Sequence, residues 1–228
     1  AHLDLTPDAG QVLFKSVNPI LLTAARADHP ITFRIDPKGF EIPIKNFSLK
    51  KMRIKDVKLD LGVLSVRNGG ILELIMTLLR IRRPADETTL WFTPVYIDMK
   101  NGVITCKRVD ALLANTVPIS AWGTVDLLNE KVNMVVGLPA ETLRSSLGLS
   151  RVPQQYMLQI PIRGTTKSPK IDAVRATAKL TALSLQGGGR SVAPTSLLGN
   201  LLEVAAGVGE RDEKVPPPTT IPFPWQKK

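Results

Sequence analysis

Apolar and polar residues alternate along much of the chain, a pattern typical of β-strands that bury one face. The alternation is clearest over 117–127 and 156–163, where apolar residues take every second position. Asn101-Gly102, between two such runs, predicts a tight hairpin turn. We therefore predict antiparallel strands over 31–35, 42–49, 52–61, 91–99, 103–109, 117–127, 132–138 and 156–163, with a slip of one residue near 55–56.

Helical patterns are shorter and fewer. They predict helices near 18–27, 71–82, 139–147 and 172–185. Asn18 and Asp172 suit N-cap positions, and Gly148 suits the C-terminal end of the third helix. The segment 71–81 is apolar nearly all round, so we expect it to be buried or to lie against another apolar surface.

The composition changes after residue 186, which predicts two parts. Residues 1–186 are expected to form one β-rich domain of the α+β class, mostly strand with a few helices. Residues 187–228 begin with a Gly-rich joint, continue through an apolar helix near 196–208 and end in a Pro-rich flexible tail. The chain starts at Ala1 without a signal peptide, and we expect it to be a piece of a longer protein.

Composition and charge narrow the possible partners. The 228 residues carry 30 Lys plus Arg and 20 Asp plus Glu, a formal net charge of +10, and 43% of them are hydrophobic, as in globular proteins. A positive charge attracts anions of any kind, including nucleic acid and anionic lipid headgroups. Aromatic residues make up only 5%, and no strand carries the paired aromatics on which single-stranded nucleic acid stacks, so no nucleic-acid partner is expected.

The sequence offers little material for catalysis or metal binding. It has one cysteine, Cys106, and two histidines, with no glycine-rich phosphate loop in a strand–helix context. We therefore expect no enzyme, no cofactor and no metal site. Cys106 alternates with Ile104 and is predicted to be a core thiol, whereas Asp98, Asp110 and Asp126 lie on polar sides or ends of strands and are predicted to be solvated.

The apolar faces of the predicted strands must be covered, and two arrangements would do this. In a closed core, a second layer of protein covers them, and the pattern alone favours this arrangement. In a groove or half-pipe, helices cover the ends and bound lipid chains cover the rest, because each buried CH₂ contributes roughly 0.8 kcal/mol.

Three segments carry a family resemblance. Residues 96–104 read YIDMKNGVI, residues 122–127 read WGTVDL, and residues 160–172 read IPIRGTTKSPKID. In order and spacing they resemble the C-terminal region of the AsmA-like proteins, the group of AsmA, TamB and YhdP. Type II secretion protein N is a related alternative. The resemblance is close over about the last third of residues 1–186, whereas the first half of these residues shares only a general similarity with the family.

The resemblance implies a fold and a function. It implies a curved antiparallel sheet that forms an apolar groove or half-pipe capped by short helices. It also implies a non-enzymatic segment of a periplasmic, inner-membrane-anchored protein that carries phospholipid or another envelope lipid towards the outer membrane. Its partners would then be lipid, the membrane surface and an outer-membrane protein. The alternative is a scaffold module with the same fold and a filled core, serving outer-membrane or secretion-machinery assembly.

The resemblance also implies which residues bind lipid, namely those on the apolar faces of the predicted strands. The groove would be lined by Val57, Leu59, Leu61, Val117, Ile119, Ala121, Val125, Val132, Met134, Val136, Tyr156, Leu158, Ile160 and Ile162. The helix at 71–81 would plug or cap the groove, or touch the bilayer surface. Three arginines at its exit would then meet anionic headgroups: Arg80, Arg82 and Arg83.

Overall fold

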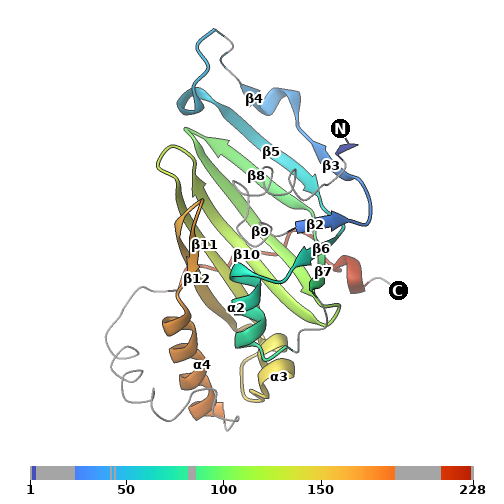
Figure 1. Ribbon diagram of the computed structural model, residues 1–228, viewed down its shortest axis with the longest axis vertical. Helices are drawn as coiled ribbons and strands as arrows, with labels where there is room; N and C mark the ends of the chain where they lie inside the picture. Colours follow the sequence, from blue (N-terminus) through green and yellow to red (C-terminus); the bar gives the residue numbers. More distant parts are fainter. Residues whose placement is uncertain are drawn as a thin grey trace.

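One antiparallel sheet dominates the fold, with thirteen strands among the residues that the structure describes (Figure 1). The computed structural model describes residues 2–3, 24–41, 43, 45–81, 86–187 and 212–226. The strands are β1 (His2–Leu3), β2 (Ala24–Ala27), β3 (Ile31–Arg34), β4 (Phe40–Glu41), β5 (Arg53–Asp60), β6 (Val63–Arg67), β7 (Glu87–Phe92), β8 (Val95–Lys100), β9 (Val103–Leu113), β10 (Val117–Asp126), β11 (Lys131–Pro139), β12 (Met157–Thr165) and β13 (Pro169–Ile171). The α-helices are α2 (Gly70–Leu78), α3 (Ala140–Leu147) and α4 (Ala173–Gly187), and short 3-10 helices lie at Pro37–Gly39, Leu49–Lys51 and Pro224–Gln226. The fold is thus mostly β with a few helices, as predicted.

Strands β8 to β12 form a meander in which neighbours in sequence are neighbours in the sheet. Asn101 and Gly102 both adopt positive φ angles at the β8–β9 turn, which confirms the predicted hairpin. The turns from β8 to β11 are short, whereas α3 and a loop connect β11 to β12. Alternation sets the register between these strands, because a slip of one residue would turn apolar side chains to the wrong face. The C-terminal half of the sheet therefore follows closely from the sequence pattern.

Strand β9 is long enough to pair with two strands on the same side. Its first half pairs with β8 and its last residues pair with β7. The sequence predicted a single strand over 91–99, but the chain breaks at Thr93-Pro94. Pro94 has no N–H group to donate to a neighbouring strand. At Thr93 the side chain bonds the neighbouring strand instead: its Oγ1 accepts from the Asp110 N–H at 2.9 Å and donates to the Asp110 carbonyl at 3.2 Å. The sheet consequently forks into a β5–β8 branch and a β6–β7 branch.

The predicted slip near 55–56 is a β-bulge. The register of β5 against β8 shifts between Ile54 and Val57, and Asp56 has a φ of 53°. The Asp56 N–H donates to Asp98 Oδ1, and Lys107 Nζ lies 2.7 Å from Asp56 Oδ1. The hydrogen bond from Lys107 holds the pKa of Asp56 below its ordinary value. Any stability that this contact adds is therefore fully present when the pH is above the pKa of Asp56 in the unfolded chain. It is lost as the pH falls through the lower pKa of Asp56 in the folded protein.

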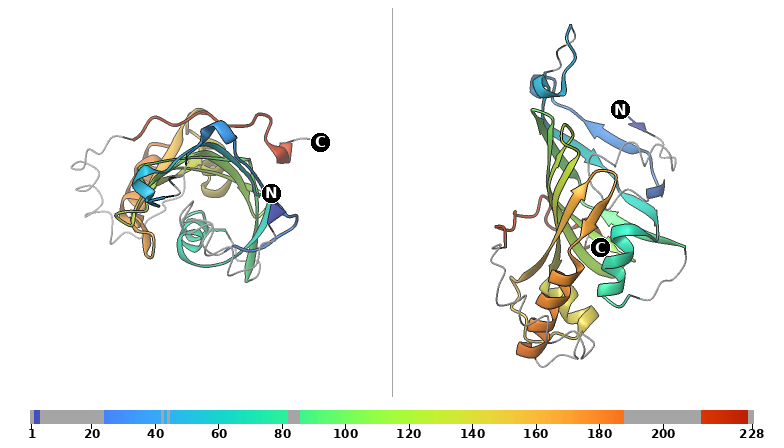
Figure 2. Two further views of the ribbon diagram at one scale, coloured as in Figure 1. Left: turned by 90° about the horizontal axis from the view of Figure 1, so that it is seen from above. Right: turned by 60° about the vertical axis from the view of Figure 1, so that its left-hand side comes forward.

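The sheet curves into an open arc, and the helices are distributed unequally around it (Figure 2). The left view of Figure 2 shows α2 on the inside of the arc. Helices α3 and α4 lie at one end of the sheet. Helix α3 packs against β10 and β11, and α4 packs against β12. We call the side that carries α2 the inner face and the opposite side the outer face.

The helix ends have local causes that the sequence indicated. Helix α2 follows Gly69 and ends where Arg80 takes a left-handed conformation and the Ile81 N–H bonds back to the Met76 carbonyl. Gly148, with a φ of 71°, ends α3 in the same way. Asp172 Oδ1 accepts from the Arg175 N–H at 2.9 Å at the start of α4, which confirms its role as an N-cap.

The segment 212–226 crosses the outer face of the sheet (red in Figure 2). Gln159 bonds Glu213 twice, through Nε2 to the Glu213 carbonyl at 2.6 Å and through Oε1 from the Glu213 N–H at 3.0 Å. Arg108 Nη1 donates to the Pro216 carbonyl at 3.0 Å, and Lys179 Nζ pairs with the carboxylate of Asp212. The predicted tail therefore lies on the body as a C-terminal strap, the name used below for residues 212–226. The predicted helix near 196–208 lies outside the described residues.

Two N-terminal expectations are wrong. The helix predicted near 18–27 is a strand where the structure describes it: Ala24–Ala27 pairs with β6 through Ala27 and Leu64, and 18–23 lie outside the described residues. Pairing along a sheet edge outweighs the modest helix preference of alanine. The strand predicted over 42–49 is not found among the residues of this segment that the structure describes, and a 3-10 helix begins at Leu49. Ile42 and Ile44 lie outside the described residues.

Candidate apolar binding face

The inner face is built from rows of apolar side chains that run across the strands. One row joins Ile160, Val136, Ala121 and Val109 through their pairing in β12, β11, β10 and β9. A second row runs Ile162, Met134, Gly123, Cys106, Ile97 and Val57 across six strands to β5. Period-two alternation within each strand and the register between strands together produce these rows.

The structure brings most of the predicted groove residues together on this face. Several of them are direct cross-strand neighbours: Ala121 and Ile160 flank Val136, Val125 pairs with Val132, and Met134 pairs with Ile162. Leu59 pairs with Val95 of β8, so β5 joins the face through β8 and β9. Tyr156 precedes β12 and packs against the edge of the same cluster. Burial raises the pKa of its hydroxyl, with a smaller contribution from the carboxylate of Asp212.

The face is covered rather than open in this structure. Twelve of the fourteen predicted residues are buried, and only Val57 and Tyr156 are half-buried. Ile160, Val136 and Leu158 have no exposed surface. This degree of burial matches a packed core and not a water-filled groove.

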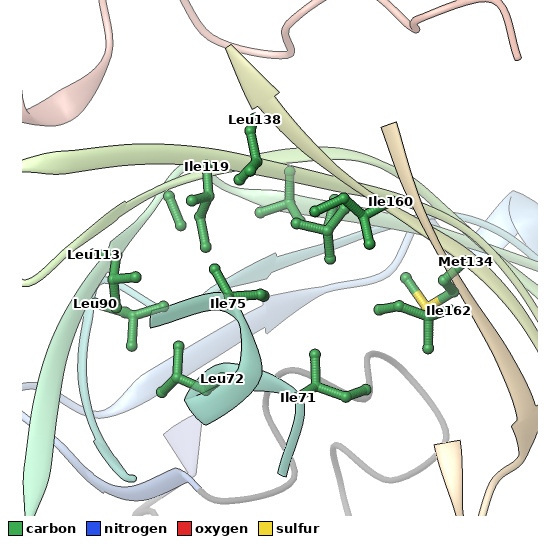
Figure 3. Packing of buried hydrophobic residues seen from close by; sticks show 14 of the residues in the cluster. Ile71, Leu72, Ile75, Leu90, Leu113, Ile119, Met134, Leu138, Ile160 and Ile162 are labelled. Carbon is green, nitrogen blue, oxygen red and sulfur yellow. The ribbon is translucent and has the colours of Figure 1, made fainter. Parts of the chain in front are cut away.

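Helix α2 provides much of the cover. Its side chains Ile71, Leu72, Ile75 and Met76 are buried, while Leu74 on the far side is exposed. Figure 3 shows Ile75 and Leu72 directed at Leu90, Leu113 and Ile119, and Ile71 on the side of Ile162. The expectation that this apolar helix is buried is confirmed.

Sequence reasoning missed several members of the face. Leu90 of β7, and Val109, Ala111 and Leu113 of β9, are all buried in the same cluster. Their alternation over 109–113 was a readable signal, but the predicted strand ended at 109. The contribution of β7 was hidden because the break at Thr93-Pro94 was not recognised as the point where one strand gives way to another.

The arginines predicted to meet headgroups are described only in part. Arg80 is exposed just after α2, at the residue whose left-handed conformation ends the helix. Arg82 and Arg83 lie outside the described residues. The structure therefore describes only one of the three predicted headgroup contacts, at the end of α2.

The thiol of Cys106 lies in the second row and is 2% exposed, as a core thiol should be. Burial raises its pKa to about 12. At neutral pH the reactive thiolate is therefore a minute fraction of the population. We expect a thiol reagent such as 5,5′-dithiobis(2-nitrobenzoic acid) to label the native protein at least about a hundredfold more slowly than the urea-unfolded protein. Equal labelling rates would contradict the burial of Cys106.

The three aspartates predicted to be solvated behave differently. Asp98 is partly exposed beside Lys107. Asp126 holds the β10–β11 turn through the Leu128 and Asn129 N–H groups, and the Asn129 side chain lowers its pKa most. Asp110 contradicts the prediction: it is 3% exposed, on the outer face. Asp110 is covered by Arg108, with which it forms an ion pair, and by the C-terminal strap that Arg108 holds. Strand alternation could not indicate this cover.

Within the described part of the chain, no cluster of three or more histidine, cysteine, aspartate or glutamate side chains is arranged to hold a metal ion. None of the helices described there is long and apolar enough to cross a bilayer. Compared with known families, curated proteins and solved structures, the chain gives no significant match to any of them.

Proposed function

We propose that this chain is a non-enzymatic module of a periplasm-spanning envelope protein. In this proposal the sheet is a half-pipe whose inner face holds phospholipid acyl chains and contributes to lipid transport between the inner and outer membranes. The observation that carries the proposal is the apolar row from Ile162 to Val57, which crosses six strands without a charged side chain. The resemblance of three segments to AsmA-like proteins supports it independently.

The chemistry of the inner face suits acyl chains. A row of aliphatic side chains offers dispersion contacts and no hydrogen-bonding group, so binding depends on chain length and not on a polar anchor. Each acyl CH₂ transferred from water contributes roughly 0.8 kcal/mol. The strand path ends at β1 and β13, which are not paired with one another among the described strands, so the arc keeps an open side.

Helix α2 has to move if lipid enters. The buried residues Leu72 and Ile75 of α2 lie against the inner face at Leu90, Leu113 and Ile119, so an acyl chain can reach that part of the face only by displacing them. The helix begins at Gly70 in a left-handed conformation, next to Gly69. We propose that α2 is a plug that leaves the arc as lipid enters, with Arg80, Arg82 and Arg83 towards the membrane surface.

Native mass spectrometry of the purified protein, with organic extraction, tests the proposal. We expect one or a few phospholipids per chain. The sharper test compares Ile75→Ala in α2 with Leu143→Ala in α3. Both side chains are fully buried, and both changes are expected to cost about 2–5 kcal/mol in the free energy of unfolding.

The two variants separate a plug from a general loss of stability. If α2 is a plug, Ile75→Ala takes up more of a fluorescent phospholipid than Leu143→Ala does at equal stability. Equal uptake by both would remove the plug from the proposal. A stable, lipid-free protein that takes up no added lipid, in the parent and in both variants, would exclude lipid binding altogether.

A second candidate is favoured by the burial of the predicted groove residues. In it the filled core is permanent, and the module is a scaffold for outer-membrane or secretion-machinery assembly. It predicts a monodisperse, lipid-free protein whose partners bind along the sheet edges, with an outer-membrane protein among them.

A further inference from the structure

A pocket of about 180 Å³ lies on the outer face, between the sheet and the C-terminal strap. The sheet contributes Arg108, Asp110 and Ser120, and the strap contributes Phe223, Trp225 and Gln226. The volume is below the roughly 300–1,000 Å³ of pockets for drug-sized ligands, so the pocket suits a ligand of a few non-hydrogen atoms.

Asp110 is the unusual group in this pocket. Its side chain is 4% exposed, yet its two oxygens differ completely. Oδ1 accepts three hydrogen bonds, from Arg108 Nε at 2.9 Å, Arg108 Nη2 at 2.7 Å and Ser120 Oγ at 2.6 Å. Oδ2 is buried with no hydrogen-bond partner among the described residues. Oδ2 lies beneath the pocket surface and out of reach of a ligand, so its charge attracts a cation in the pocket only through space.

The donors around Asp110 are already committed to protein acceptors. Arg108 directs Nε and Nη2 to Asp110 and Nη1 to the Pro216 carbonyl. Ser120 donates its proton to Asp110, and Thr116 donates to the Ala114 carbonyl. The arginine is therefore in place to hold the site together and not to receive an anion from solution.

The remaining groups favour a cation. Glu141, at the start of α3, brings a second carboxylate to the pocket wall. With Arg108, Asp110 and Glu141 counted together, the wall carries one net negative charge. Phe223 and Trp225 stack with ring centroids 4.9 Å apart, and an aromatic face attracts an ammonium ion.

We infer that this pocket binds a small ligand bearing a primary ammonium group, which lies against the aromatic pair of the C-terminal strap and is attracted by the carboxylates of Asp110 and Glu141. Arg108 joins the site to the strap, because the same guanidinium holds Asp110 and Pro216. Ligand binding and docking of the strap therefore stabilise one another. The inference does not rest on the proposed function, because the pocket lies on the outer face.

Titration of the full chain with ethanolamine tests this inference. The protein has three tryptophans, and their indole N–H signals can be followed separately by NMR. We expect saturable binding in the millimolar range, as befits so small a ligand, with the Trp225 signal moving most. Ethylene glycol, which lacks the charge, and inorganic phosphate, which reverses it, are expected not to bind there.

Three substitutions assign the binding to the pocket. Asp110→Asn keeps an acceptor for Arg108 and Ser120 but removes the buried negative charge, so affinity should fall about tenfold or more. Glu141→Gln, at an exposed position, should weaken binding less and leave thermal stability unchanged. Asp60→Asn, an exposed aspartate on β5, is the matched control and should bind like the parent.

Two sources of the ammonium group are distinguished by vesicles. Flotation with vesicles of phosphatidylglycerol alone is compared with vesicles that also contain phosphatidylethanolamine. A gain that depends on phosphatidylethanolamine and is reduced in Glu141→Gln identifies a lipid headgroup. Ethanolamine binding without that gain identifies a free amine. The inference is overturned if ethanolamine fails to bind the parent protein. It is also overturned if Glu141→Gln and a folded Asp110→Asn bind ethanolamine as tightly as the parent does.

Discussion

Replacing Ile160 with aspartate is expected to unfold the protein. Ile160 is 0% exposed, and its row neighbours Val136 and Ala121 are buried beside it. A carboxylate at this position would lose its hydration without gaining a partner, a change that exceeds about 4 kcal/mol in comparable cores. Single domains have only about 5–15 kcal/mol of stability in total. The variant should therefore be insoluble or show no cooperative thermal transition by circular dichroism.

Ile221→Asp is the matched control. Ile221 lies in the C-terminal strap with 76% of its surface exposed, so the same chemical change should alter the free energy of unfolding by less than about 0.5 kcal/mol. If Ile160→Asp folded normally and lost only lipid uptake, the inner face would be an open groove that α2 does not fill.

This expectation restricts which variants can test lipid binding. In an open half-pipe, a charged substitution would block lipid without unfolding the sheet. In the structure, the same substitution removes the core itself. Smaller changes such as Ile75→Ala are therefore the informative ones, because they weaken the contact between α2 and the sheet without placing a charge in it.

The C-terminal half of the fold was predictable because local and long-range signals agree there. From Val103 onwards, alternation and sheet neighbours coincide, and each strand pairs with the next one in sequence even where α3 connects β11 to β12. Asn101-Gly102, Gly148 and Asp172 mark boundaries by backbone conformation or capping, which are local properties. The apolar residues of β10 to β12 could therefore be assigned to one face from the sequence alone.

The N-terminal half was less predictable because its pairing is between distant segments. Ala24–Ala27 is a strand only because β6, some 40 residues later, offers an edge. The break at Thr93-Pro94 depends on Asp110, whose backbone bonds the Thr93 hydroxyl across the sheet. The burial of Asp110 depends in turn on the C-terminal strap. No local pattern records such contacts, and the pocket on the outer face was missed for that reason.

The second large effect is expected at Gly123, where the backbone of β11 lies close to β10. Gly123 has a φ of 137° at the bulge where the β9–β10 register shifts. A Cβ there would lie 2.4 Å from the Asn133 backbone oxygen and 2.6 Å from Met134 Cα. Both atoms belong to the β11 backbone, so relief would require the strand to move. Gly123→Ala combines backbone strain of about 1–3 kcal/mol with overpacking of about 1–3 kcal/mol.

Gly148→Ala separates the two causes. Gly148 also has a positive φ, 71°, but a Cβ there would meet no atom within 4 Å, so only strain of about 1–2 kcal/mol is expected. Urea unfolding curves of both variants with a common slope give the two losses directly. A loss at Gly123 no greater than that at Gly148 would mean that the close approach is absent. A larger loss would show that this glycine permits the contact between β10 and β11 on which the second apolar row depends, since Gly123 lies in that row between Met134 and Cys106.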